Sequence, residues 1–404
     1  MVLRRSLLFA CFFFFGLIHT VFACDVVSCE EKKADDGLYL SCLSSNKQCL
    51  ESKITEVRSQ KATLNSTISI IGNKISLQEL SISLTLAEIS KLEKDIGLLG
   101  ERISTLNFSL DQLTSMLLKR VRERYKSSTV APLALLANSQ TFAEVITSSR
   151  YMSKASQQTA LIMRQAELQK QLFDLQKEKK ETAQLLLEQK RKLLEQQKRE
   201  LASQKAGQQK LLEVTKNNEK NYQQLLASAQ AEIAAFKNYS SSKTGGILPS
   251  QQSPDGWFFS QRDERWGGVT IANSSESILD VGCLITSTAM IKKKFGEDVT
   301  PLSIARNSSY FFGGTAYMLR PWPAPAGYRY ESATYSYNLL EQKVKENPVV
   351  IKLAAGPYGT HFIVIKESRN GQFIMHDPWE GFDKNFTDFY NLGQITNISY
   401  LVRN

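Results

Sequence analysis

A seven-residue repeat of apolar side chains extends from Ile54 to Arg120, through ten repeats. Its period of 3.5 residues, kept over this length, predicts a coiled coil rather than a globular fold. About 70 residues at 1.5 Å each would make a rod of roughly 100 Å. The two core positions read Ile54, Lys61, Ile68, Ile75, Ile82, Ile89, Ile96, Ile103, Leu110, Leu117 and Val57, Leu64, Ile71, Gln78, Thr85, Leu92, Leu99, Leu106, Leu113, Arg120.

A second helical arm is expected from about Tyr151 to Tyr239, where Leu and aromatic residues recur at helical spacing. The first pattern breaks at Ser127–Pro132, and short apolar pieces follow it. We therefore predict an antiparallel coiled-coil hairpin over residues 51–239, with its tip at about 127–150. Each arm could instead pair with another chain, because Ile and Leu at the core positions also suit parallel dimers. The oligomeric state stays open.

The composition changes sharply after residue 239. Only one of ten prolines, Pro132, precedes residue 248, and all four tryptophans follow residue 250. Residues 240–256, rich in Ser, Gly and Pro, indicate a linker. Residues 257–404, about 150 in number, are enough for one packed domain.

The C-terminal segment is expected to contain one buried helix followed by strands. The helix covers Cys283–Phe295 and ends at Gly296. Three apolar runs predict strands over 349–353, 361–366 and 372–376, with a hairpin loop at 367–371. A helix that precedes antiparallel strands is typical of an α+β fold. We expect the aromatic segment 317–337 to line the substrate cleft.

The first 23 residues are typical of a secretory signal peptide. Arg4 and Arg5 precede an apolar run from Leu7 to Ile18, and Val21–Ala23 offers small residues for cleavage. The alternative is an uncleaved anchor. The segment predicts a secreted protein associated with the cell envelope.

Six cysteines divide into a cluster and two single residues. Cys11 lies in the signal segment, Cys283 stands alone, and the cluster is Cys24, Cys29, Cys42 and Cys49. In an exported chain the cluster favours disulfides over a metal site. Nested 24–49 and 29–42 bridges would staple a short helical hairpin over residues 24–50, although other connectivities are open. Cys24 could instead carry a lipid.

The net charge of +10 lies wholly in the helical region, because residues 51–244 hold 30 basic and 20 acidic side chains. This excess could favour anionic envelope polymers. A solvated helix surface rich in Lys and Gln explains it equally well. We expect no nucleic-acid partner for an exported chain, and neither a metal ion nor a cofactor.

Cys283, His361 and Asp377 have residue types and an order that suit nucleophilic amide hydrolysis. Gly282-Cys283 places the sulfur at a helix N-terminus, where the dipole favours the thiolate. If Lys366 pairs with Gln372, His361 stands directly opposite Asp377, at a Cβ separation of about 5 Å. His376 would then face the other way, although a one-residue slip would exchange the two histidines.

Each of these residues also has an ordinary structural interpretation. Cys283 could be an inert buried thiol, His361 a core histidine and Asp377 a turn residue before Pro378. Gln261 is our candidate for the amide that stabilises the oxyanion, or else a structural glutamine.

The C-terminal domain, residues 257–404, resembles the double-glycine (bacteriocin-leader) peptidase-like branch of the papain superfamily. The similarity rests on the segments 259–266, 282–290, Gly359-Thr360-His361-Phe362 and Asp377-Pro378. It implies a papain-like fold, with Cys283, His361 and Asp377 catalytic and Gln261 as oxyanion helper.

The helical region, residues 50–240, resembles the regulatory coiled coil of bacterial peptidoglycan hydrolases. The similarity rests on Arg122–Lys126, Pro132–Leu136, Phe142 and Tyr151. It implies restraint of the hydrolase until a membrane complex binds the coiled-coil tip. We therefore expect a secreted cysteine hydrolase that cuts amide bonds in peptidoglycan peptides. The alternatives are a peptidase of exported proteins and a non-enzymatic envelope scaffold.

Overall fold

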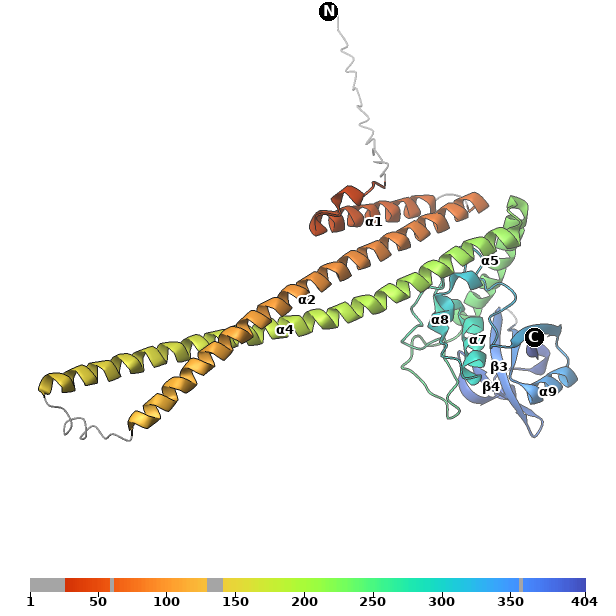
Figure 1. Ribbon diagram of the computed structural model, residues 1–404. Helices are drawn as coiled ribbons and strands as arrows, with labels where there is room; N and C mark the ends of the chain where they lie inside the picture. Colours follow the sequence, from red (N-terminus) through yellow and green to blue (C-terminus); the bar gives the residue numbers. More distant parts are fainter. Residues whose placement is uncertain (1–25, 59–61, 129–140, 356–358) are drawn as a thin grey trace, which may run out of the picture.

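The computed structural model describes residues 26–58, 62–128, 141–355 and 359–404 (Figure 1). The expected signal segment, Cys24 and residues 129–140 of the expected tip lie outside the described residues. Within the described ranges, no helix is both long and apolar enough to cross a membrane.

The N-terminal residues form a short 3-10 helix, η1 (Glu30–Lys32), and a single helix, α1 (Asp36–Arg58), where we expected a helical hairpin. A disulfide joins Cys29 to Cys42, the inner of the two nested bridges. Helix α1 lies beside α2 (Leu64–Ser128), and Lys94 on α2 pairs with Asp36 at 3.0 Å. Cys24, which would form the outer bridge with Cys49, lies outside the described residues.

The heptad pattern therefore does not follow one continuous helix, because Ile54 and Val57 belong to α1. The new helix begins at a capping box. The Thr63 N–H donates to the Ser66 hydroxyl at 2.8 Å, and the Ser66 N–H donates to Thr63 Oγ1 at 3.1 Å. These bonds satisfy donors that a helix start leaves free, and so favour a start at this point.

Helices α2 and α4 (Phe142–Thr215) pack as antiparallel arms (Figure 1). In the contacts between the two arms, residue numbers rise along α2 while they fall along α4. These contacts are Glu79 with Lys205, Glu88 with Lys190, and Arg120 with Gln158. The intramolecular hairpin pairs the two arms within one chain.

The second arm is interrupted where we expected one helix to residue 239. Lys216 and Asn217 have φ values of 49° and 50°, in the left-handed region that ends a helix. Asn218 then caps α5 (Glu219–Ser242) by accepting from the N–H groups of Lys220 and Asn221. The break turns α5 toward the C-terminal domain (Figure 1).

The end of α4 shares a core with the C-terminal domain. Ser203 donates a hydrogen bond to Asn307 Oδ1 at 2.9 Å and accepts one from the Ser308 N–H at 2.6 Å. A Cβ at Gly207 would lie 3.0 Å from the Ser308 carbonyl oxygen, so the helix approaches the domain closely there. Phe312 is fully buried in one cluster with Leu211 and Tyr222.

The C-terminal domain is a six-stranded antiparallel sheet with order β1-β6-β2-β3-β4-β5, which is consistent with the predicted α+β class. Its strands are β1 (Tyr328–Thr334), β2 (Val349–Ala354), β3 (Thr360–Arg369), β4 (Gln372–Asp377), β5 (Gly381–Asn385) and β6 (Ile395–Arg403). Its α-helices are α6 (Ile278–Val281), α7 (Cys283–Lys294), α8 (Pro301–Ala305) and α9 (Tyr337–Glu346). The 3-10 helices are η2 (Ser308–Tyr310), η4 (Phe386–Asp388) and η5 (Leu392–Gln394).

Hydrophobic cores cover both faces of this sheet. Val350, Phe362 and Val364 belong to a cluster with residues of α7, whereas the alternate residues Ile351 and Ile363 pack with residues of α9. Because side chains alternate along a strand, this division places α7 and α9 on opposite faces.

The β3–β4 register differs from our prediction. The turn is the two-residue Asn370-Gly371, both with positive φ, so Arg369 and not Lys366 pairs with Gln372. A bulge then leaves Lys366 without a partner in β4, and Val364 pairs with His376. Without the bulge at Lys366 in β3, Asp377 would pair with Val364. The Asp377 side chain would then lie on the face of the sheet opposite to His361. The bulge therefore brings His361 and Asp377 to one face.

Candidate catalytic site

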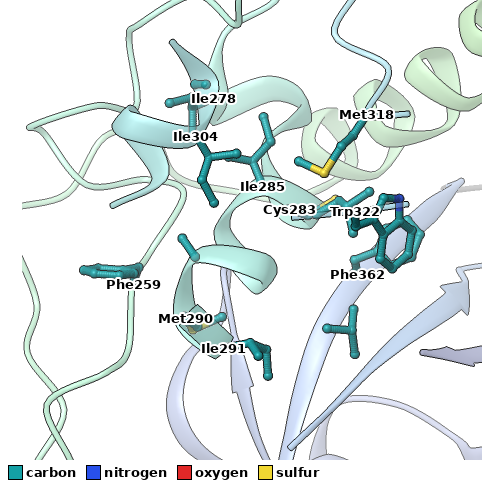
Figure 2. Packing of buried hydrophobic residues seen from close by; sticks show 14 of the residues in the cluster. Phe259, Ile278, Cys283, Ile285, Met290, Ile291, Ile304, Met318, Trp322 and Phe362 are labelled. Atoms are coloured by element: carbon teal, nitrogen blue, oxygen red, sulfur yellow. The ribbon is translucent and has the colours of Figure 1, made fainter. Parts of the chain in front are cut away.

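Cys283 is the first residue of α7, directly after Gly282. A Cβ at Gly282 would lie 2.3 Å from the carbonyl oxygen of Ile278, so only glycine permits this sharp passage from α6 to α7. The thiol lies at the N-terminus of the helix, as we predicted, beside Met318, Trp322 and Phe362 (Figure 2). Its residue is only 3% exposed.

The His361 ring lies at the start of β3 and meets the end of β4. Its Nε2 atom lies 2.8 Å from Asp377 Oδ1, and both side chains are fully buried. Because Asp377 occupies Nε2, Nδ1 is the nitrogen left for the thiol. Within the described part of the chain, Nδ1 has no hydrogen-bond partner.

Asp377 is held from several directions. Its Oδ1 accepts the Trp379 N–H at 2.7 Å and the Glu380 N–H at 3.2 Å, and its Oδ2 accepts the Tyr390 hydroxyl at 2.7 Å. Burial opposes ionisation of this carboxyl, but the charge of His361 and these hydrogen bonds outweigh burial and lower its pKa. The carboxylate is therefore the stable form and fixes the imidazole.

The imidazole is correspondingly basic. Burial favours the neutral ring, but the charge and hydrogen bond of Asp377, with a further contribution from the Cys283 thiol, raise the pKa of His361 to about 9. The Cys283 thiol is close enough to this ring to contribute to its pKa. At neutral pH the site holds an imidazolium between a carboxylate and a sulfur, an arrangement able to support nucleophilic attack by the thiolate.

Gln261 is buried and connects the two ends of this group. Its backbone N–H donates to the carbonyl of Pro378, next to Asp377, at 3.0 Å. Its side-chain Nε2 donates to the carbonyl of Leu279, in α6, at 2.8 Å. The amide thus lies between the segments that present Asp377 and Cys283, which suits either an oxyanion donor or a brace.

Two tyrosines that the sequence analysis missed complete the site. The Tyr239 ring, from α5, stacks on the His361 ring with 4.0 Å between centroids and 10° between planes. Its hydroxyl lies 2.6 Å from that of Tyr390, which in turn bonds Asp377. Burial and the negative charge of Asp377 raise the pKa of both phenols, so both stay neutral. No sequence motif marks either residue.

Helix α5 covers this site. The Phe236 ring packs edge-on against Phe362 at 5.7 Å, and a Cβ at Gly359 would come within 2.0 Å of the Ala235 carbonyl oxygen. Lys243 pairs with Glu380 at 2.6 Å, three residues after Asp377. With α5 in this position, Cys283 is almost completely buried and His361 is fully buried.

A pocket of about 400 Å³ lies beside the thiol. Leu284 lines it from α7, and Phe362 lines it from β3. Tyr317, Met318 and Trp322 line it from the segment that we expected to wall the cleft, and α5 closes it with Glu232 and Phe236.

His376 takes part in a different cluster. Its ring faces away from His361 and contacts Asp255 at 3.1 Å and the Trp257 ring at 4.2 Å between centroids. Asp255, His376 and Asp383 have the composition of a cation site. The Lys366 ammonium, however, lies 2.5 Å from Asp255 and 2.6 Å from Asp383, so both carboxylates already pair with a cationic side chain.

A cysteine at a helix N-terminus, beside a histidine and an aspartate on an antiparallel sheet, is the arrangement of a papain-type cysteine hydrolase. Residues 258–402 match the family model described as Peptidase_C39 like family. This match supports a C39-like domain of the papain superfamily with a cysteine peptidase-type function. It does not extend to the helical region. No curated protein and no solved structure matches the chain.

Proposed function

We propose that this protein is an exported cysteine hydrolase that cuts amide bonds in peptidoglycan peptides, under the control of its coiled coil. The observation that carries the hydrolase is the buried pair of His361 and Asp377, 2.8 Å apart, beside the Cys283 thiol. A structural core histidine does not require a carboxylate partner with three further hydrogen-bond donors.

The chemistry follows from these positions. The Cys283 thiolate attacks the amide carbonyl carbon, and the electron pair of the carbonyl moves to oxygen. The His361 imidazolium then protonates the leaving amine as the C–N bond breaks, which yields a thioester. Water, deprotonated by the neutral His361, hydrolyses the thioester, which expels the thiolate and restores the thiolate–imidazolium pair. Asp377 keeps the ring oriented throughout.

The choice of substrate rests on the envelope features of the chain. The N-terminal segment is typical of a signal peptide, and the excess of basic side chains falls in the helical region. Basic arms would hold the protein on anionic wall polymers. The resemblance of the arms to the regulatory region of peptidoglycan hydrolases supports the same substrate and a membrane complex as regulator at the tip.

Control by the helical region is supported by the position of α5. Tyr239 covers the base, and Phe236 closes the pocket beside the nucleophile. Release of α5 would open both without any change in the sheet. The break at Lys216 and Asn217 separates α5 from the docked α4 and supplies a pivot for such a release.

Incubation of the full-length chain carrying Phe236→Ala with purified sacculi tests the proposal. We expect soluble muropeptides, because this change loosens α5 and leaves Cys283, His361 and Asp377 in place. The same chain with Cys283→Ala should release none. Mass spectrometry identifies the bond that is cut. Cleavage of polypeptides but not of sacculi would favour a peptidase of exported proteins, and no cleavage of either would favour a scaffold.

Hydrolysis is expected to fall as the pH rises through about 9, the pKa of His361, because the imidazolium that protonates the leaving amine is lost. The stability contributed by the ion pair changes in the same direction. The pKa of His361 in the folded protein exceeds its unfolded value of 6.5. The stabilisation by the ion pair is therefore complete below about pH 6.5 and is lost as the pH rises through about 9. Alkylation of Cys283 needs no proton donor and should not fall. A flat hydrolysis rate between about pH 8 and pH 10 would contradict the assignment.

Gln261→Ala is expected to lower kcat for amide hydrolysis by about 10²-fold or more, the usual cost of one oxyanion donor. Alkylation of Cys283 by iodoacetamide forms no oxyanion, so its rate should be unchanged. An equal loss in both reactions would show that Gln261 only braces the segments around Leu279 and Pro378.

A further inference from the structure

The pocket beside Cys283 carries charges that apolar packing does not require. Arg320 and Lys352 line it, and so does Glu232 of α5. The geometry points to a subsite in which Arg320 and Lys352 bind a carboxylate of the substrate, a position that Glu232 occupies while α5 is closed. The inference rests on the proposed function and adds the substrate class: peptides with an acidic group near the scissile bond.

The position of the pocket suits a substrate residue. It is lined by Met318, Trp322 and Phe362, the three residues beside the Cys283 thiol (Figure 2). Its volume of about 400 Å³ lies within the range of small-ligand sites, roughly 300–1,000 Å³. A peptide bound at the thiol would therefore place a neighbouring side chain in this space.

The side chains of Arg320 and Lys352 each lie over an aromatic ring. The Arg320 guanidinium lies 4.1 Å from the centroid of the Trp322 ring and donates to the Ser332 hydroxyl at 2.6 Å. Among the residues that the structure describes, no carboxylate pairs with Arg320. The Lys352 ammonium lies 5.7 Å from the Phe362 ring centroid. Arg320 thus keeps donors free for an anion, and its planar guanidinium suits a carboxylate.

The carboxylate of Glu232 indicates that the pocket can bind an acidic group. Its carboxylate lies 3.5 Å from the Lys352 ammonium, and the side chains are 23% and 34% exposed. Since Glu232 belongs to α5, release of the helix would leave Lys352, like Arg320, without an acidic partner among the described side chains. A substrate carboxylate would then restore the pairing, so the helix and the substrate compete for one binding position.

The test uses the full-length chain with Phe236→Ala and two thiol-reactive peptides that differ only by Glu or Gln. The variable residue is placed one or two positions before the electrophile, and the rate of Cys283 labelling is measured by mass spectrometry. We expect the Glu peptide to react about tenfold faster at one of these positions, which corresponds to about 1.4 kcal/mol.

Arg320→Gln and Lys352→Gln should each reduce this preference, measured as the ratio of the Glu-peptide rate to the Gln-peptide rate in the same variant. Lys345→Gln is the matched control, since it removes one positive charge on α9, where the side chain is 68% exposed. Equal rates for the two peptides at both positions, or a preference that survives both pocket variants, would overturn the subsite alone. Failure of both peptides and of iodoacetamide to label Cys283 would instead refute the reactive thiol, and with it the proposed function.

Discussion

Alanine in place of Phe236 is expected to raise the rate of Cys283 alkylation in the full-length chain about 100-fold. The residue is buried against Phe362, and a buried Phe→Ala change costs about 3–5 kcal/mol. About 3 kcal/mol of this loss, acting on the docking of α5, would raise the open population about 100-fold. Iodoacetamide labelling followed by mass spectrometry measures the rate. The thiol would become accessible with no change to the catalytic side chains.

Two pairs of variants make this result specific. Asn238→Ala alters an exposed neighbour of Tyr239 on α5 and should leave the rate unchanged. Gly359→Ala should also open the site, because the new Cβ would meet the Ala235 carbonyl. Gly327→Ala imposes a similar positive-φ strain in open space and is its control. Unchanged labelling in both Phe236→Ala and Gly359→Ala would contradict the covering role of α5.

His361→Ala, introduced into the Phe236→Ala chain, is expected to lower hydrolysis by about 10⁴-fold or more, as loss of a triad base does in other hydrolases. Without the imidazole, the thiol loses its proton acceptor and the leaving amine its proton donor. Release of muropeptides over time measures the loss. The lost ion pair also affects folding, so thermal unfolding should be recorded for each variant.

His376→Gln distinguishes the two histidines of the domain. His376 contacts Asp255 and lies on the other face of β4, so its replacement should alter stability more than chemistry. The fraction of folded protein that remains should keep its hydrolysis rate. A greater loss of rate per folded molecule in His376→Gln than in His361→Ala would reverse the assignment of the base.

Much of the secondary structure could be predicted because it depends on local patterns. The heptads indicated long helices, and the helix after Gly282 and the strands around His361 and Gln372 were found within a few residues. The heptads could not locate the start of α2, because Ile54 and Val57 continue the same period in α1. Thr63 and Ser66, whose hydrogen bonds cap the new helix, and the Asn217-Asn218 pair were the available signals.

The site could be predicted only in part, because its residues come from distant segments. His361 and Asp377 were chosen from an incorrect register, and the bulge at Lys366, which no pattern revealed, restores their common face. The Asn370-Gly371 dipeptide was a sufficient signal for the tighter turn. Tyr239 and Tyr390 contact each other across 151 residues of sequence, a distance at which periodicity carries no information.

The docking of α4 at Ser203 gives the molecule the geometry of a lever. From Phe142 to this contact the helix extends about 90 Å, and from the contact to Thr215 about 18 Å, at 1.5 Å per residue. Beyond Ser203 the helix is also held at Gly207 and Leu211. A sideways force at the far end of a straight α4 would therefore act on these contacts through an arm about five times as long as the docked end, and a small force there would strain the junction with α5.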